Sequence, residues 1–146
     1  MTGGPGFRVT RAAPVAMLVL SLAIGPSVAA AGAIGASSTV ADPARLAAGG
    51  RALQVRGVVR CSACSGFTLG ATVSQRGSGA IAQGGVRCTC HSAAEHWVLT
   101  ARAREGTRFR PGAARVCVWV TARSQGGEAI DARQWCESVT LTAAGA

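Results

Sequence analysis

The chain of 146 residues contains no lysine, no asparagine and no tyrosine. Without asparagine it has no acceptor for N-linked glycosylation. All fifteen basic residues are therefore arginine, and the formal net charge is +9. The three missing residues use A/T-rich codons, whereas the abundant alanine, glycine and arginine use G/C-rich codons. The bias is typical of a high-GC genome, so codon drift explains part of the arginine excess.

Few side chains are available for general acid–base catalysis, because the chain has only two histidines and six acidic residues. No Gly-x-Ser-x-Gly motif is present, which argues against a serine hydrolase. Glu95 and His96 could act as base and acid in a small basic hydrolase of the ribonuclease kind. Neighbouring residues on a strand point to opposite faces, however, so these two would share a site only across a bulge.

The first 31 residues have the pattern of a secretory signal peptide. Arg8 and Arg11 precede an apolar run over residues 12–24, Gly25-Pro26 ends that run, and small residues follow. The apolar run of about 13 residues is shorter than the ~20 of a membrane-spanning helix, which disfavours the alternative of an uncleaved anchor. The two arginines are not adjacent, so twin-arginine export is not indicated.

Cleavage is expected between Ala30 and Gly35, where small residues fill the −1 and −3 positions. No cysteine precedes Cys61, so no lipid anchor follows the apolar run. Removal of residues 1–31 takes away two arginines and lowers the net charge from +9 to +7. Residues 32–50 have little to bury and are expected to be a flexible leader. Residues 51–143 are then expected to be one small domain.

From residue 51 the apolar residues alternate with polar ones, which predicts antiparallel strands with one buried face. The alternating runs cover residues 53–61, 67–74, 86–90, 97–104, 116–123 and 129–142. Glycine-rich or proline-containing breaks are expected at Arg76–Gly79, Gly84-Gly85, Pro111-Gly112 and Gly126-Gly127. No sustained helical period occurs after the signal peptide. Six or seven short strands favour an immunoglobulin-like antiparallel β-sandwich, with a small β-barrel as the alternative.

Six cysteines in a small exported chain predict a disulfide framework. They are Cys61, Cys64, Cys88, Cys90, Cys117 and Cys136. A sharper alternative is tetrahedral zinc on Cys61, Cys64, Cys88 and Cys90 with His91 nearby. Export argues against it, because zinc–thiolate sites need reduced cysteines. A redox role for Cys61-Ser-Ala-Cys64 would need a helix N-terminus, but its flanks look like strands.

The last two cysteines are expected to pair across one hairpin. Gly126-Gly127 suits a two-residue hairpin turn, because glycine supplies the positive φ that such turns require. Cys117 and Cys136 are equidistant from the centre of that turn, so they lie opposite each other. The same register opposes Val118 to Trp135 and Val120 to Arg133. It places the core on Val116, Val118, Val120, Trp135, Val139 and Leu141, and the disulfide on the other face beside Trp119.

Arginine is concentrated in one segment near the middle of the domain. Five arginines fall within fourteen residues: Arg102, Arg104, Arg108, Arg110 and Arg115. They predict either a patch for a polyanion, such as a wall polymer, an acidic lipid surface or nucleic acid, or an ordinary solvated face. Base stacking would require exposed aromatic residues among them, and only Phe109 is available.

A further pattern consists of Arg60-Cys61, Gly84-Gly85 before Cys90, His96-Trp97, Phe109, Pro111–Ala114 and Val116. With this pattern the chain resembles a family of small exported actinobacterial β-domains of uncharacterised function. The resemblance covers about residues 50–120; it implies the fold class, export and a pairing of Cys61 with Cys90, but no activity. The chain departs from the family in its four further cysteines and in lacking Asp-Gly after the second cysteine. We expect Cys64 and Cys88 to form a second link parallel to the first.

The sequence therefore favours an exported, non-catalytic β-domain that binds or supports something at the cell surface. Its expected partner is an anionic envelope polymer or another exported protein, with no cofactor and no specific nucleic-acid motif. The alternatives are a small basic secreted hydrolase and a metal or redox module built on Cys61, Cys64, Cys88 and Cys90.

Overall fold

The computed structural model describes residues 32–144 and shows an all-β protein. Its long strands are β3 (Ala52–Arg60), β4 (Gly66–Gln75), β5 (Ala80–Thr89), β6 (Ala94–Ala103), β7 (Gly112–Arg123) and β8 (Ala129–Thr142). Two short strands, β1 (Thr39–Val40) and β2 (Ala44–Ala47), and a 3₁₀ turn η1 (Ala48–Gly50) precede them. The predicted signal peptide and part of its cleavage region lie outside the described residues. The part of the chain that the structure describes contains no helix with the length and hydropathy of a membrane span.

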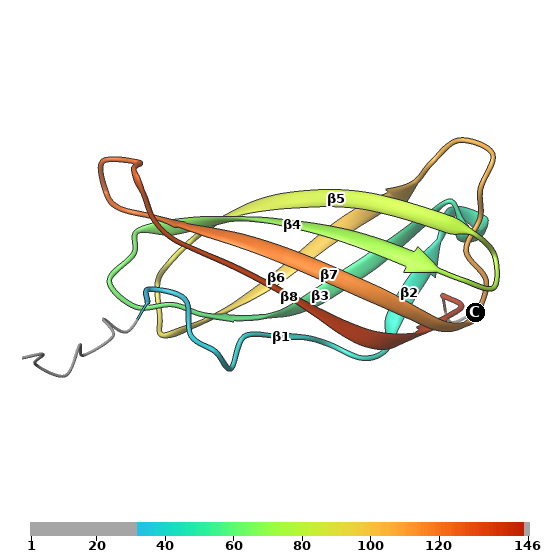
Figure 1. Ribbon diagram of the computed structural model, residues 1–146, viewed down its shortest axis with the longest axis horizontal. Helices are drawn as coiled ribbons and strands as arrows, with labels where there is room; N and C mark the ends of the chain where they lie inside the picture. The colour runs from blue at the N-terminus through green and yellow to red at the C-terminus, as the bar shows by residue number, and fades with distance from the viewer. Residues whose placement is uncertain (1–31, 145–146) are drawn as a thin grey trace, which may run out of the picture.

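The strands close into a barrel of seven strands, whose long axis runs along the strands (Figure 1). The order around it is β3, β2, β8, β7, β4, β5 and β6, and β6 pairs with β3 along the whole of β3. β2 is parallel to β8 but antiparallel to β3, so the barrel is mixed. The predicted β-sandwich is therefore wrong, and the alternative of a small barrel is confirmed.

Alternation with one buried face fits both architectures, which is why the sequence did not separate them. The β3–β6 and β2–β8 ladders show that the structure is a barrel, because they pair the edge strands that a sandwich leaves unpaired. Inward side chains of the long strands fill the interior, and all strands of residues 32–144 belong to one sheet. The largest fully buried side chains are Trp97, Phe67, Leu53, Leu69, Leu141, Val55, Val59, Val73, Val116, Val118 and Val120.

The expected flexible leader is a structural part of the barrel. Ile34 bridges to Cys61, β1 pairs with β3, and β2 lies between β3 and β8. Ala44 and Leu46 of β2 are buried. The prediction of a flexible leader is thus wrong from Ile34 onward. A segment with few apolar residues can belong to the barrel because the short strand β2 buries only two side chains.

The expected break at Gly84-Gly85 is also absent, because β5 runs straight through it. A Cβ on Gly84 would lie 2.4 Å from the carbonyl oxygen of Thr100, so the glycine allows β5 to approach the β6 backbone closely. Beyond Ala82 and Gln83, β5 and β6 are no longer paired. The glycine therefore marks the crossing of two strands and does not end one.

The β7–β8 hairpin has the predicted register. Cys117 lies opposite Cys136, and Val118 lies opposite Trp135. The turn itself is longer than predicted: Ser124 N–H donates to the Glu128 carbonyl, and Gly127 N–H donates to the Ser124 carbonyl. A bulge at Ile130, between the partners of Arg123 and Ala122, restores the register that a two-residue turn would have given.

Candidate functional site

The topology sorts the candidate residues to opposite ends of the barrel. The β3–β4 loop and the β5–β6 loop, which carry Cys61, Cys64 and Cys90, meet at one end. The β4–β5 turn and the long β6–β7 loop meet at the other end, together with the start of β3. We call the first the thiol end and the second the arginine end; they lie at the left and the right of Figure 1.

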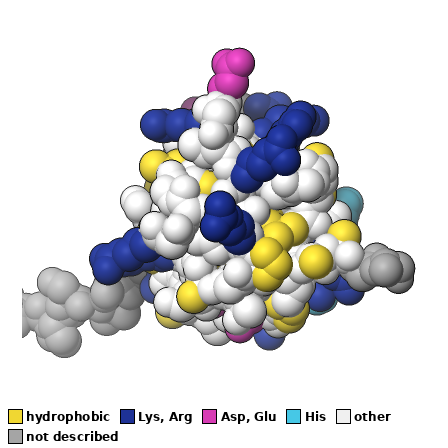
Figure 2. Space-filling model, turned by 90° about the vertical axis from the view of Figure 1, so that its right-hand side faces the viewer, with side chains coloured by type: hydrophobic (Ala, Val, Ile, Leu, Met, Phe, Trp, Pro, Cys, Tyr) yellow, Lys and Arg dark blue, Asp and Glu magenta, His cyan; other side chains and the backbone are white. Residues whose placement is uncertain are grey.

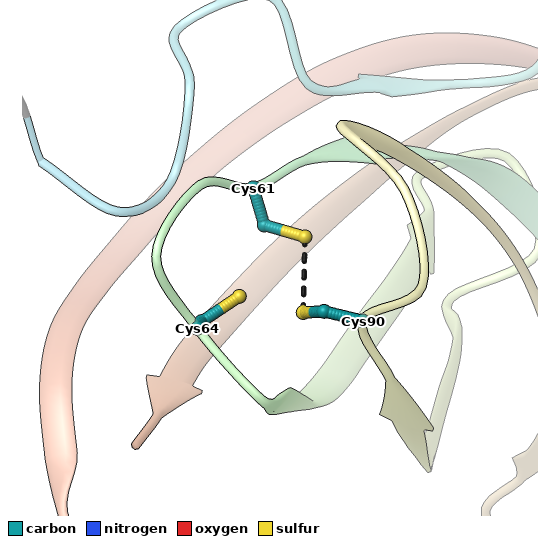
Figure 3. A group of neighbouring side chains, drawn as sticks. All are labelled: Cys61, Cys64 and Cys90. Carbon is teal, nitrogen blue, oxygen red and sulfur yellow. Dashed lines mark hydrogen bonds between the residues drawn. The ribbon is translucent and has the colours of Figure 1, made fainter. Parts of the chain in front are cut away.

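At the thiol end, Cys61 and Cys64 flank a tight loop and Cys90 follows β5. Ala63 has a positive φ of 52°, which turns the chain back and brings both loop cysteines to the same side. The backbone is held on both flanks: Cys61 N–H donates to the Ala93 carbonyl and Cys90 N–H donates to the Ser65 carbonyl. The loop geometry therefore aims all three side chains at one point (Figure 3).

The sulfur atoms of Cys61, Cys64 and Cys90 all lie within 4.8 Å of one another. We call these three residues the cysteine trio. The Cys61 and Cys90 sulfurs are 3.0 Å apart and are not bonded. Cys88 lies outside this group, one inward position earlier on β5, and is also unbonded. The structure thus brings together three of the four cysteines that the sequence considered, and leaves the predicted Cys61–Cys90 and Cys64–Cys88 links as predictions.

Burial raises the pKa of both Cys61 and Cys90. It also raises the pKa of the Cys88 thiol. At neutral pH these thiols are therefore protonated. Nucleophilic cysteines of disulfide-exchange enzymes have lowered pKa values, which is the opposite of the direction at Cys61 and Cys90.

The structure places His96 and Glu95 on different faces of β6. His96 is exposed on the outer face of β6, whereas Glu95 lies on the alternate face. The Glu95 carboxylate accepts hydrogen bonds from the backbone N–H groups of His91 and Ser92, and these bonds lower its pKa. The expectation of opposite faces is confirmed, and Glu95 shapes the turn after Cys90.

The arginine end gathers the predicted polyanion patch. Arg104, Arg108 and Arg110 project from the β6–β7 loop, and Arg102 and Arg115 lie on the adjoining parts of β6 and β7; all five are exposed. Arg51 and Arg76, which the sequence analysis had not included, lie at the same end, and Figure 2 shows arginine side chains spread across it. Among the described residues, none of the five predicted guanidinium groups lies within 4.0 Å of a carboxylate oxygen.

The loop that carries these arginines has a fixed backbone. The buried Gln75 side chain donates to the Arg110 carbonyl at 2.8 Å and accepts from the Arg110 N–H at 2.9 Å. Phe109, only 3% exposed, packs inward, and its N–H donates to the Gly50 carbonyl. Phe109 therefore anchors the loop and offers no surface for base stacking.

Arg51, Arg104 and Arg108 line an open pocket together with Glu105, Gly106 and Thr107. Glu105 is the only acid between residues 102 and 115. Two arginines elsewhere on the barrel use their guanidinium groups for hydrogen bonds within the protein. Arg123 donates to the Thr68 hydroxyl and to the Gly127 carbonyl, and Arg133 donates to the Ile34 carbonyl. The arginine end thus presents fixed, uncommitted positive charge over an open surface.

The Cys117–Cys136 disulfide lies away from both ends, on the outer face of the β7–β8 hairpin. The two sulfurs are 2.10 Å apart and the two Cα atoms 4.0 Å apart, as the predicted cross-strand pairing requires. Trp119, two residues along the same face, covers Gly70 and is 43% exposed. This disulfide staples one hairpin and takes no part in either candidate site.

No protein-family model, curated protein or solved structure matches the chain.

Proposed function

We propose that this protein is exported and binds an anionic polymer of the cell envelope through its arginine end. The observation that carries the proposal is the cluster of five exposed, unpaired guanidinium groups, three of them on one anchored loop. Phosphate and carboxylate groups are the natural ligands of such groups, because guanidinium donors match their oxygen pairs.

Codon bias does not account for this arrangement. A high-GC genome raises the number of arginines, but drift gives no reason for them to collect at one end of a barrel. Residues 51, 76, 102, 104, 108, 110 and 115 hold seven of the thirteen arginines of the described chain. Their collection on a fixed loop and adjoining strands supports a binding role, since an anchored loop loses little conformational entropy on binding.

A repeating polyanion suits this surface better than a small ligand or single-stranded nucleic acid. Two pockets at the arginine end are open and have arginine side chains in their linings, whereas small-molecule sites are enclosed and mostly apolar. Single-stranded nucleic acid binding relies on exposed aromatic platforms, and Phe109 is buried.

The test compares two variants that each lose three positive charges. Arg104→Gln/Arg108→Gln/Arg110→Gln alters the arginine end, and Arg56→Gln/Arg60→Gln/Arg87→Gln alters exposed arginines elsewhere on the barrel. The probe is a soluble poly(glycerol phosphate), measured by calorimetry at several salt concentrations, with a neutral glucan as the blank. We expect the first variant to weaken binding by about tenfold or more, and the second to change it little.

Equal weakening by both triple variants would show that only net charge matters, and would overturn the site. Tighter binding of single-stranded DNA than of poly(glycerol phosphate) would overturn the envelope polymer in favour of nucleic acid. In the wild-type protein, affinity should fall steeply as salt rises, because polyanion binding releases counterions.

A further inference from the structure

The cysteine trio is not used by the proposed polymer binding, since it lies at the other end of the barrel. Three sulfurs converge there from two separate loops, and only two of them can join in one disulfide. The trio lines an open pocket with Ser62, Ala63, His91, Ser92 and Ala93, so a small solute can reach it. Three converging, accessible sulfurs are the ligand set of a thiophilic metal ion.

The separations of the sulfurs fit a metal with modest adjustment. Ligands about 2.3 Å from one ion lie roughly 3.8 Å from one another. The Cys61 and Cys90 sulfurs, now 3.0 Å apart, would have to separate by less than an ångström, and all three sulfurs already lie within 4.8 Å. Cys64 is half-buried on the loop, and its sulfur already belongs to the converging group.

The number of ligands separates two candidate ions. Structural zinc requires four protein ligands in a tetrahedron, and neither Cys88 nor His91 belongs to the group of converging ligand atoms. Monovalent copper is a softer ion that thiolates select, and three of them can complete its coordination. We propose that, in the reduced protein, Cys61, Cys64 and Cys90 bind one Cu(I) ion as a three-thiolate site.

A disulfide between Cys61 and Cys90 would close this site. An external disulfide oxidant would take the two thiol hydrogens with two electrons, form the Cys61–Cys90 bond and leave as two thiols. Only Cys64 would remain as a ligand. The two sulfurs at 3.0 Å lie between the separations of the disulfide and of the metal-bound state, so the same trio can serve both states.

Thiolates, not thiols, bind the metal, so binding releases protons. Each cysteine that enters the site as a thiol therefore gives its proton to the solvent when the ion binds.

The experiment titrates Cu(I) into the exported protein, fully reduced and under anaerobic conditions, against a chromogenic Cu(I) chelator. We expect one Cu(I) per chain. Cys64→Ser and Cys90→Ser should each weaken binding by more than about a hundredfold, because losing a ligand exceeds the 10- to 100-fold effect of an outer-shell partner. Cys88→Ser, the matched control for a nearby thiol outside the trio, and His91→Ala should leave the affinity unchanged.

Absence of stoichiometric binding would overturn the proposal, as would equal losses in Cys88→Ser and Cys64→Ser. Tighter binding of Zn(II) than of Cu(I), with dependence on His91, would replace the copper site with a tetrahedral zinc site. The oxidised protein gives a second readout: peptide mapping should find Cys61 joined to Cys90, and this form should bind no Cu(I). Circular dichroism of each variant checks that the barrel is intact.

Discussion

Glu95 organises the thiol end although it is not a ligand in either proposal. Its carboxylate accepts N–H donors from His91 and Ser92, and also the Ser92 hydroxyl, so the chain turns sharply after Cys90. Ala63 makes the matching turn on the other loop with its positive φ. Glu95 and Ala63, which belong to no recognisable motif, thus determine where the three sulfur atoms meet.

The pH dependence of stability should reveal this role of Glu95. Backbone hydrogen bonds lower its pKa below the ordinary value of 4.5, so its contribution is present above pH 4.5. That contribution is lost as pH falls from 4.5 through the lowered pKa of the folded state. Glu95→Gln should therefore be less stable than wild type at pH 6, and the difference should shrink in acid.

The measurement is denaturant unfolding from pH 6 down to the acid limit of folding. Glu105→Gln, an exposed acid at the arginine end, is the control. Identical pH profiles of the Glu95 and Glu105 variants would show that the hydrogen bonds at the thiol end add nothing to stability.

Among the elements, the β7–β8 hairpin has the longest strands and carries the disulfide. Its inner face, with Val116, Val118 and Val120, belongs to the core, whereas Cys117 and Cys136 lie on the outer face. The core face keeps the hairpin in register without help from the disulfide, because a one-residue slip would expose every buried valine.

Removal of the disulfide should therefore lower stability without changing the fold. The sequence separation of 19 residues gives at most about 3 kcal/mol in the chain-entropy model. Cys117→Ser/Cys136→Ser is expected to lose up to that amount in denaturant unfolding, while cross-strand NMR contacts between Val118 and Trp135 persist. Thr121→Ser/Ala132→Ser, an opposed pair nearer the turn, is the control and should stay close to wild type. Loss of the cross-strand contacts in the cysteine variant would show that the disulfide sets the register.

At the scale of the whole molecule, the short strand β2 completes the barrel. It spans only four residues, yet it pairs with β3 on one side and β8 on the other. Leu46 points inward and is 7% exposed, whereas its neighbour Arg45 points outward. Closure therefore depends on a segment whose composition is that of a linker.

Paired substitutions in β2 test this dependence. Leu46→Asp should destabilise the protein by about 3 kcal/mol or more, because it removes a buried apolar side chain and places a carboxylate in the core. Arg45→Asp, one residue away and exposed, should stay within about 1 kcal/mol of wild type. Denaturant unfolding measures both, and equal small effects would mean that residues 32–50 behave as a flexible leader after all.

The features that depend on local periodicity could be predicted from the sequence alone. Alternation predicted the long strands and their buried faces, and the spacing about Gly126-Gly127 predicted that Cys117 would lie opposite Cys136. The predicted register is correct although the predicted turn type is not, because the bulge at Ile130 compensates for the longer loop. The crowding of arginine between residues 102 and 115 was also visible in the sequence.

The closure of the strands into a barrel could not be predicted in this way. A strand with one buried face has the same alternating pattern in a sandwich and in a barrel. In addition, β2 has too few residues for its alternation to be recognised. Barrel closure in turn sorts the loops to two ends: it brings Cys61 and Cys64 to Cys90 and buries Phe109 beneath the arginines. These relations join residues that are distant in the chain, and strand order, which no local pattern encodes, sets which of them meet.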